Sequence, residues 1–133
     1  MKTELTQAQK EARGRLAMAK TIVTDAGDEA LDLGLPGTAG LFRRIETRLV
    51  GNTIDKIDGA IRWAITAVDA RRTRMAVVQD DPDIPVARRA GATCARSVLA
   101  DAKRRLDTLV AGRPNVVAGS PDEDDTSPEQ TDE

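Results

Sequence analysis

The sequence predicts an all-α protein: a small antiparallel helical bundle of three long helices with a disordered acidic C-terminal tail. Apolar residues recur at steps of three and four, no stretch shows the sustained alternation of a strand, and glycine- or proline-containing segments separate the periodic stretches. We therefore expect a helical bundle domain over residues 1–113 and a disordered acidic tail over residues 114–133.

The first periodic stretch has a helix-start signal and a clear end. Thr3 or Thr6 can cap the helix, and Thr6 and Gln9 have the spacing of a capping box, in which each residue hydrogen-bonds the backbone of the other. We expect Gly27 to end or bend this helix and Asp28 to cap a short turn. The glycine- and proline-containing segment 34–37 then predicts a chain break.

The middle helix is expected to begin at a Thr38 cap and to be interrupted. The pair Gly51-Asn52 is typical of a helix stop and restart, because glycine accepts left-handed geometry and Asn52 or Thr53 can cap the next helical segment. One continuous helix with a kink at this pair is the alternative.

The strongest apolar pattern lies between residues 54 and 75, where large side chains form a heptad-like seam and Arg71 fills the one polar position. Trp63 points nearly opposite to this seam, on a face of small residues. Either the helix is central and buried on both sides, or Trp63 anchors an interface. The residues that we expect at such an interface are Trp63, Phe42, Ala60 and Ala67.

A loop is expected over residues 79–85, with Pro85 at the start of the last helix. The apolar stripe of that helix passes through Cys94 or Ala95, and we interpret Cys94 as a small buried thiol. Gly112 and Pro114 are expected to end it. Charged residues one turn apart predict surface ion pairs: Glu11–Arg15, Asp58–Arg62, Asp101–Arg105 and Lys103–Asp107.

Composition excludes several classes of function. The chain has no histidine and one cysteine, so histidine triads, histidine metal sites and intrachain disulfides are impossible. It has no calcium-binding or nucleotide-binding loop motif. We expect no enzyme activity, no cofactor, no metal and no small-molecule ligand. It has no run of about 18 apolar residues and no signal peptide, so we expect a cytoplasmic protein without a membrane contact.

Charge is distributed unevenly along the chain. Residues 119–133 hold seven acids and no base, which leaves 20 bases and 15 acids in residues 1–118. Arginine clusters suit phosphate recognition, although they also simply keep helical faces solvated. The candidate nucleic-acid contacts are Arg71, Arg72, Arg74, Arg88, Arg89, Lys103, Arg104 and Arg105.

Two functions remain open. The first is a helical interaction or assembly protein: a subunit or adaptor of a larger complex, such as a viral structural or accessory protein. It would act through self-association or a protein partner, because an alanine-rich core buries little area per residue. The alternative is a nucleic-acid-associated regulator that binds phosphates through its arginines. Its acidic tail would then act as an autoinhibitor or as a mimic of DNA.

Overall fold

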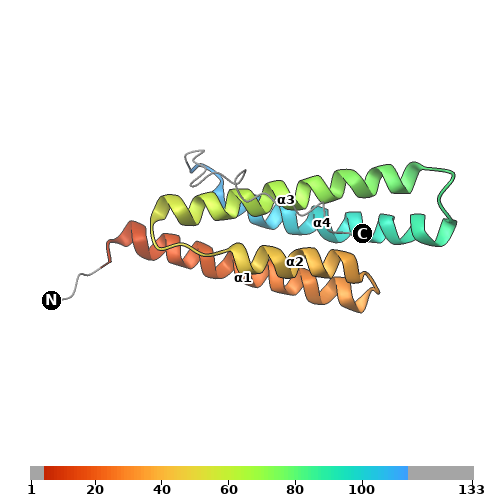
Figure 1. Ribbon diagram of the computed structural model, residues 1–133. Helices are drawn as coiled ribbons and strands as arrows, with labels where there is room; N and C mark the ends of the chain where they lie inside the picture. The colour runs from red at the N-terminus through yellow and green to blue at the C-terminus, as the bar shows by residue number, and fades with distance from the viewer. Residues whose placement is uncertain (1–4, 114–133) are drawn as a thin grey trace.

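Four helices form the part of the chain that the computed structural model describes, residues 5–113. They run alternately up and down as two antiparallel hairpins that lie side by side (Figure 1). Their bounds are α1 (Gln7–Asp32), α2 (Pro36–Arg48), α3 (Ile54–Asp80) and α4 (Val86–Val110). The all-α class is confirmed, and residues 5–113 contain no strand. The predicted tail, residues 114–133, lies outside the described residues.

The predicted interruption of the middle helix is a complete break between α2 and α3, so the bundle has four helices in residues 5–113 and not three. Thr53 is the N-cap of α3, and its hydroxyl accepts a hydrogen bond from the backbone N–H of Lys56. A methyl group on Gly51 would lie 3.1 Å from the backbone nitrogen of Ile57. Gly51 has no positive φ, so the break requires glycine for close backbone approach and not for left-handed geometry.

Helix α1 begins as predicted and ends later than predicted. Thr6 and Gln9 form the full capping box. The helix runs through Gly27, where a methyl group would lie only 3.3 Å from the Cβ of Phe42. This glycine therefore lets α1 and α2 approach closely, and Asp28 lies inside the helix instead of capping a turn.

The turn between α1 and α2 lies within the predicted break. Gly34 has a φ of 76°, and the N–H of Leu35 donates to the carbonyl of Ala30 in a Schellman motif. Helix α2 begins at Pro36, where proline already has a helical φ and lacks the N–H that would be unpaired. Thr38 is therefore a buried residue of the first turn and not the N-cap.

The core lies between the two hairpins. Its largest fully buried side chains come from all four helices and from the segment after α2: Phe42, Leu41, Ile45, Leu49, Ile57, Ile61, Leu99, Leu106, Val23 and Val68. Alanines fill much of the rest. The predicted seam is confirmed, with Ile54 and Met75 half-buried at its two ends. The α3–α4 hairpin extends past the α1–α2 turn at one end of the bundle (Figure 1).

Candidate functional site: an arginine-lined groove

A groove of about 660 Å³ lies beside the α1–α2 turn, between the first part of α2 and the α3–α4 hairpin. Its described lining includes three arginines from three different helices and no carboxylate. The lining residues are Gly34, Leu35, Pro36, Gly37, Thr38, Gly40, Arg44, Arg71, Met75, Val78, Ala87, Arg88, Gly91, Ala92 and Ala95. We call this feature the groove.

The groove exists because α2 packs mainly on α1 and makes few contacts with α3. Glycines leave the intervening space unfilled. Among residues 5–113, a methyl group on Gly37 would meet no atom within 4 Å, and one on Gly40 would meet only the Arg44 guanidinium at 3.9 Å. On the other side, the one described residue that a methyl on Gly91 would touch is Leu35, at 3.9 Å. Small residues on both sides of this junction thus produce an opening instead of a core.

Arg71 lies at the base of this opening. It occupies the polar position of the α3 seam, and it is only 5% exposed. Its Nη1 lies 3.4 Å from the carbonyl oxygen of Gly37, to which it donates a hydrogen bond. Arg71 therefore spans the space between α3 and the first turn of α2.

The other two arginines lie nearer to solvent. Arg44 projects from α2 and Arg88 from the first turn of α4, and both are exposed. Three guanidinium groups around one groove make it positively charged, since arginine remains protonated at any ordinary pH. Guanidinium groups also bind carboxylates and phosphates through paired N–H donors. The groove can therefore accept an anionic ligand.

Apolar side chains form the remaining walls and part of the surroundings. Leu35, Met75 and Val78 line the groove. The two turns at this end of the bundle also carry four of the seven exposed large hydrophobic residues that the described chain has: Leu31, Leu33, Val77 and Val86. A ligand that combines negative charge with apolar groups therefore fits this end better than a simple anion.

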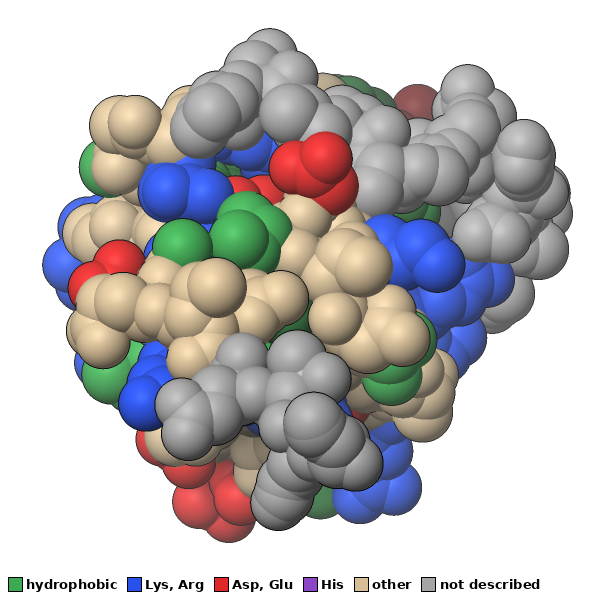
Figure 2. Space-filling view, turned by 90° about the vertical axis from the view of Figure 1, so that its left-hand side faces the viewer, with side chains coloured by type: hydrophobic (Ala, Val, Ile, Leu, Met, Phe, Trp, Pro, Cys, Tyr) green, Lys and Arg blue, Asp and Glu red, His purple; other side chains and the backbone are tan. Residues whose placement is uncertain are grey.

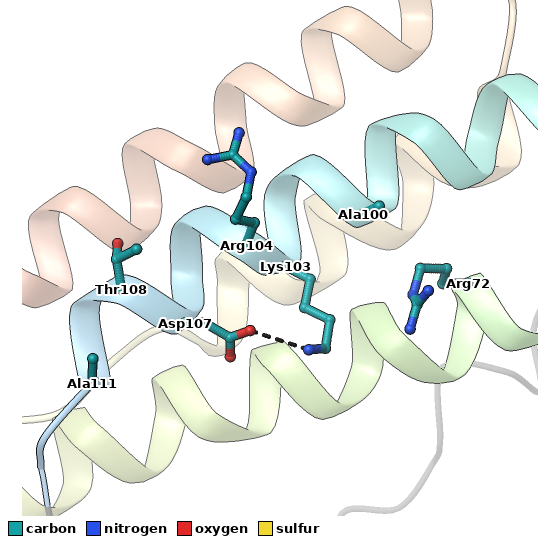
Figure 3. A pocket seen from close by; sticks show the side chains of 7 residues that line it. All are labelled: Arg72, Ala100, Lys103, Arg104, Asp107, Thr108 and Ala111. Atoms are coloured by element: carbon teal, nitrogen blue, oxygen red, sulfur yellow. Dashed lines mark hydrogen bonds and ion pairs between the residues drawn. The ribbon is translucent and has the colours of Figure 1, made fainter.

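A second groove, of about 470 Å³, lies between α3 and the last part of α4 (Figure 3). Its cations are each paired with an aspartate: Arg72 with Asp69, Lys103 with Asp107, and Arg104 with Asp101. Arg104 also projects away from Lys103 and Arg72 (Figure 3). These three predicted nucleic-acid contacts therefore do not converge on one anion.

The remaining predicted nucleic-acid contacts are spread over α3 and α4. Arg89 is half-buried and donates to the carbonyl of Ile84, which fixes it to the α3–α4 loop. Arg105 pairs with Asp101, as the sequence predicted, and Arg74 is half-buried. Seen from the end opposite the groove, lysine and arginine side chains lie at several separate places around the surface (Figure 2).

The predicted interface residues divide into two groups. Phe42 and Ala67 are buried at 1% and 5% exposure, so they belong to the core of the single chain. Trp63 and Ala60 are half-buried and pack against that core. The guanidinium carbon of Arg48 lies 5.1 Å from the centroid of the Trp63 ring, a cation–π distance. An interface at Trp63 stays a prediction.

The interpretation of Cys94 as a buried thiol is wrong. Cys94 is exposed, and its neighbour Ala95 is the residue that faces the core. Both positions fitted the apolar stripe, and adjacent helical residues differ by about 100° in direction. Among residues 5–113, no group of three or more metal-ligating side chains lies close enough to hold an ion.

A buried ionic cluster that the sequence did not predict lies at the end of the bundle opposite the groove. Asp58 has a side chain only 3% exposed, and both of its oxygens accept hydrogen bonds. Arg15 of α1 donates to Oδ1 at 2.9 and 3.0 Å, and Arg113 after α4 donates to Oδ2 at 2.9 and 3.0 Å. We call these three residues the clamp, since they join α1, α3 and the end of α4.

The clamp corrects two predicted ion pairs. Arg15 contacts Asp58 instead of Glu11, which accepts a hydrogen bond from Gln7. Arg62 donates instead to two carbonyl oxygens at the end of α4, those of Val110 and Arg113. Spacing along one helix could not reveal these partners, because they are 43 to 55 residues apart in sequence. The predicted Lys103–Asp107 pair is confirmed.

Comparison with known proteins gives no match to a family model, to a curated protein or to a solved structure. None of the helices in residues 5–113 combines the length and the apolar character needed to cross a membrane.

Proposed function

We propose that this chain is a non-enzymatic interaction protein, a subunit or adaptor whose groove binds an acidic segment of a protein partner. The observation that carries the proposal is the convergence of Arg44, Arg71 and Arg88, from three helices, on one groove with apolar walls. Guanidinium groups suit binding and not proton transfer, because their pKa lies far above neutral pH.

The mixed lining favours a peptide over a nucleic acid. An acidic peptide can place carboxylates against the arginines and apolar side chains against Leu35, Met75 and Val78. A single-stranded nucleic acid usually stacks its bases on aromatic side chains. The described aromatic residues are Phe42, which is buried, and Trp63, which does not line the groove.

The proposal is tested with a fluorescent synthetic peptide that is rich in Asp and Glu and has interspersed leucines. Its anisotropy is followed as protein is added. We use the wild-type chain and a full-length variant in which Asp122, Glu123, Asp124 and Asp125 become the matching amides, so that these acids cannot compete. We expect the variant to bind the peptide, and we expect binding to weaken as salt rises.

Two adjacent arginines of α2 provide a matched pair of charge reversals. Arg44→Glu, introduced into the amide variant, should weaken peptide binding by at least about tenfold, because it replaces a guanidinium of the groove with a carboxylate. Arg43→Glu changes the same net charge on the same helix, and Arg43 is exposed outside the groove lining. Arg43→Glu should weaken peptide binding by no more than about threefold, which is the long-range electrostatic contribution of one exposed charge.

Labelled duplex DNA and single-stranded RNA are titrated in the same way. Binding of either nucleic acid with the same Arg44 dependence, and no binding of the peptide, would favour the phosphate-binding alternative. Equal losses from Arg43→Glu and Arg44→Glu would show that the groove is not the site. Absence of binding to every probe would remove the proposal.

A further inference from the structure

We infer that residues 119–133 of this chain occupy the groove of the same molecule and thereby compete with the partner segment. This inference rests on the proposed function, and it adds a means of regulating that site. It is carried by three observations: the charge of the segment, the charge of the groove, and the length of chain between Arg113 and the segment's first acids.

The charges are complementary. Residues 119–133 contain seven acids and no base, and four of the acids are consecutive, Asp122 to Asp125. The described groove lining contributes Arg44, Arg71 and Arg88 and no carboxylate. Clustered carboxylates and clustered guanidinium groups form charge-assisted, often bidentate hydrogen bonds.

The connecting chain has the length that this contact requires. Helix α4 runs from the groove end of the bundle to the opposite end (Figure 1). A segment after Arg113 that docks in the groove must therefore return along this helix. The return from Val110 to the level of Ala95 or Arg88 is about 22 to 33 Å at 1.5 Å per residue. Nine residues, 114 to 122, span about 30 Å when extended. The four consecutive acids can therefore reach the level of the arginines.

Docking of residues 119–133 in the groove of their own molecule is favoured by their high local concentration but not by apolar contacts. A tethered segment has an effective concentration of the order of millimolar. However, residues 119–133 contain no Leu, Ile, Val, Met or aromatic residue that could cover the apolar walls. A partner segment with both acids and apolar side chains would make contacts that the chain's own segment lacks. The segment would thus act as a displaceable competitor that excludes weaker anionic ligands.

Cys94, the only cysteine of the chain, offers a direct test on the full-length protein. It is exposed, and it precedes Ala95 of the groove lining. A nitroxide attached there broadens the NMR signals of nuclei near the groove. We expect the amide signals of Asp122 to Asp125 to be broadened, and we expect them to recover at high salt and in an Arg44→Glu, Arg88→Glu variant.

A second label site separates a docked segment from one that visits the whole surface. In a Cys94→Ser, Lys10→Cys variant the nitroxide lies near the start of α1, at the opposite end of the bundle. If the segment is docked, a nitroxide at position 94 broadens its amide signals, and a nitroxide at position 10 broadens them much less. Similar broadening from both sites would overturn the inference.

A mixing experiment decides whether the contact is within one molecule. Isotope-labelled chains without nitroxide are mixed with unlabelled chains that carry it at Cys94. The broadening in this mixture is compared with that in the sample whose chains carry both the isotope and the nitroxide. Equal broadening would show docking between copies and would overturn the inference as stated.

The peptide titration separates failure of this inference from failure of the proposed function. If the segment docks, the amide variant should bind the acidic peptide at least about threefold more tightly than the wild-type chain, as expected for removal of a tethered competitor. Equal binding by the two chains, without broadening from Cys94, would overturn the inference and leave the proposed function intact. Loss of peptide binding in both chains would remove the proposed function itself.

Discussion

At one end of the bundle two arginines converge on the buried carboxylate of Asp58, whereas at the other end three arginines line an open groove to which no described residue adds a carboxylate. The residue type is the same, but the surroundings differ. In the clamp, large side chains and a buried aspartate fill the space between helices. In the groove, glycines leave that space open. The difference indicates that arginines serve stability in the clamp, and we propose that they serve ligand binding in the groove.

The largest expected effect is the loss of the clamp's carboxylate. Asp58→Ala leaves Arg15 and Arg113 without their shared partner and should lower the free energy of unfolding by about 3 kcal/mol. Most of this loss comes from the Arg15 side, since the Arg113 side chain is 34% exposed. Urea denaturation followed by circular dichroism measures the change.

The control for this experiment is an exposed aspartate on the same helix. Asp55 lies in the first turn of α3, where it interacts with the helix dipole. Asp55→Ala should therefore cost less than about 1 kcal/mol. If the two variants lose equal stability, the clamp is not a stabilising element and the comparison of the two ends fails.

Glycines at the two ends should respond to alanine in opposite directions. Gly51→Ala places a methyl group 3.1 Å from the Ile57 backbone nitrogen, so we expect a loss of about 2 kcal/mol. Of the described residues, Gly40→Ala, in the groove, meets only the flexible end of Arg44, at 3.9 Å. It should gain about 0.5 kcal/mol from higher helix propensity. Thermal unfolding of both variants measures this contrast, and a loss at Gly40 as large as that at Gly51 would contradict it.

The sequence predicted the features of the fold that depend on local spacing. The capping box at Thr6, the break at Gly51 and the buried phase of Arg71 on its helix all depend on residues within a few turns of one another. The clamp could not be predicted from local spacing, because Arg15 and Asp58 meet only through the packing of α1 on α3.

The groove could not be predicted either. Helical periodicity shows which face of a helix is buried, but it does not show how closely two helices approach. The sequence has glycines at 34, 37 and 40, and the segment 34–37 predicted only a chain break between helices. Only the structure places Arg44, Arg71 and Arg88 from three helices around the same space.

Arg71→Met separates binding from stability at the groove. Methionine keeps the apolar stem and removes the guanidinium together with its hydrogen bond to the Gly37 carbonyl. Loss of that hydrogen bond should lower the free energy of unfolding by less than about 1.5 kcal/mol, which is smaller than the effect of Asp58→Ala. Binding of the acidic peptide should nevertheless weaken by about tenfold. A stability loss equal to that of Asp58→Ala would place Arg71 with the structural arginines of the clamp.

The smallest expected effect concerns Cys94, which lies on the groove half of the α3–α4 hairpin and outside the core. Because its side chain is exposed, Cys94→Ser should change the free energy of unfolding by less than about 0.5 kcal/mol. The thiol of the folded wild-type chain should also react with a disulfide reagent at a rate close to that of the urea-unfolded chain. Ala95→Leu provides the contrast, since Ala95 is 2% exposed and the larger side chain should cost about 2 kcal/mol. A protected thiol, or equal losses at the two positions, would mean that α4 is rotated from the orientation that places Gly91, Ala92 and Ala95 in the groove.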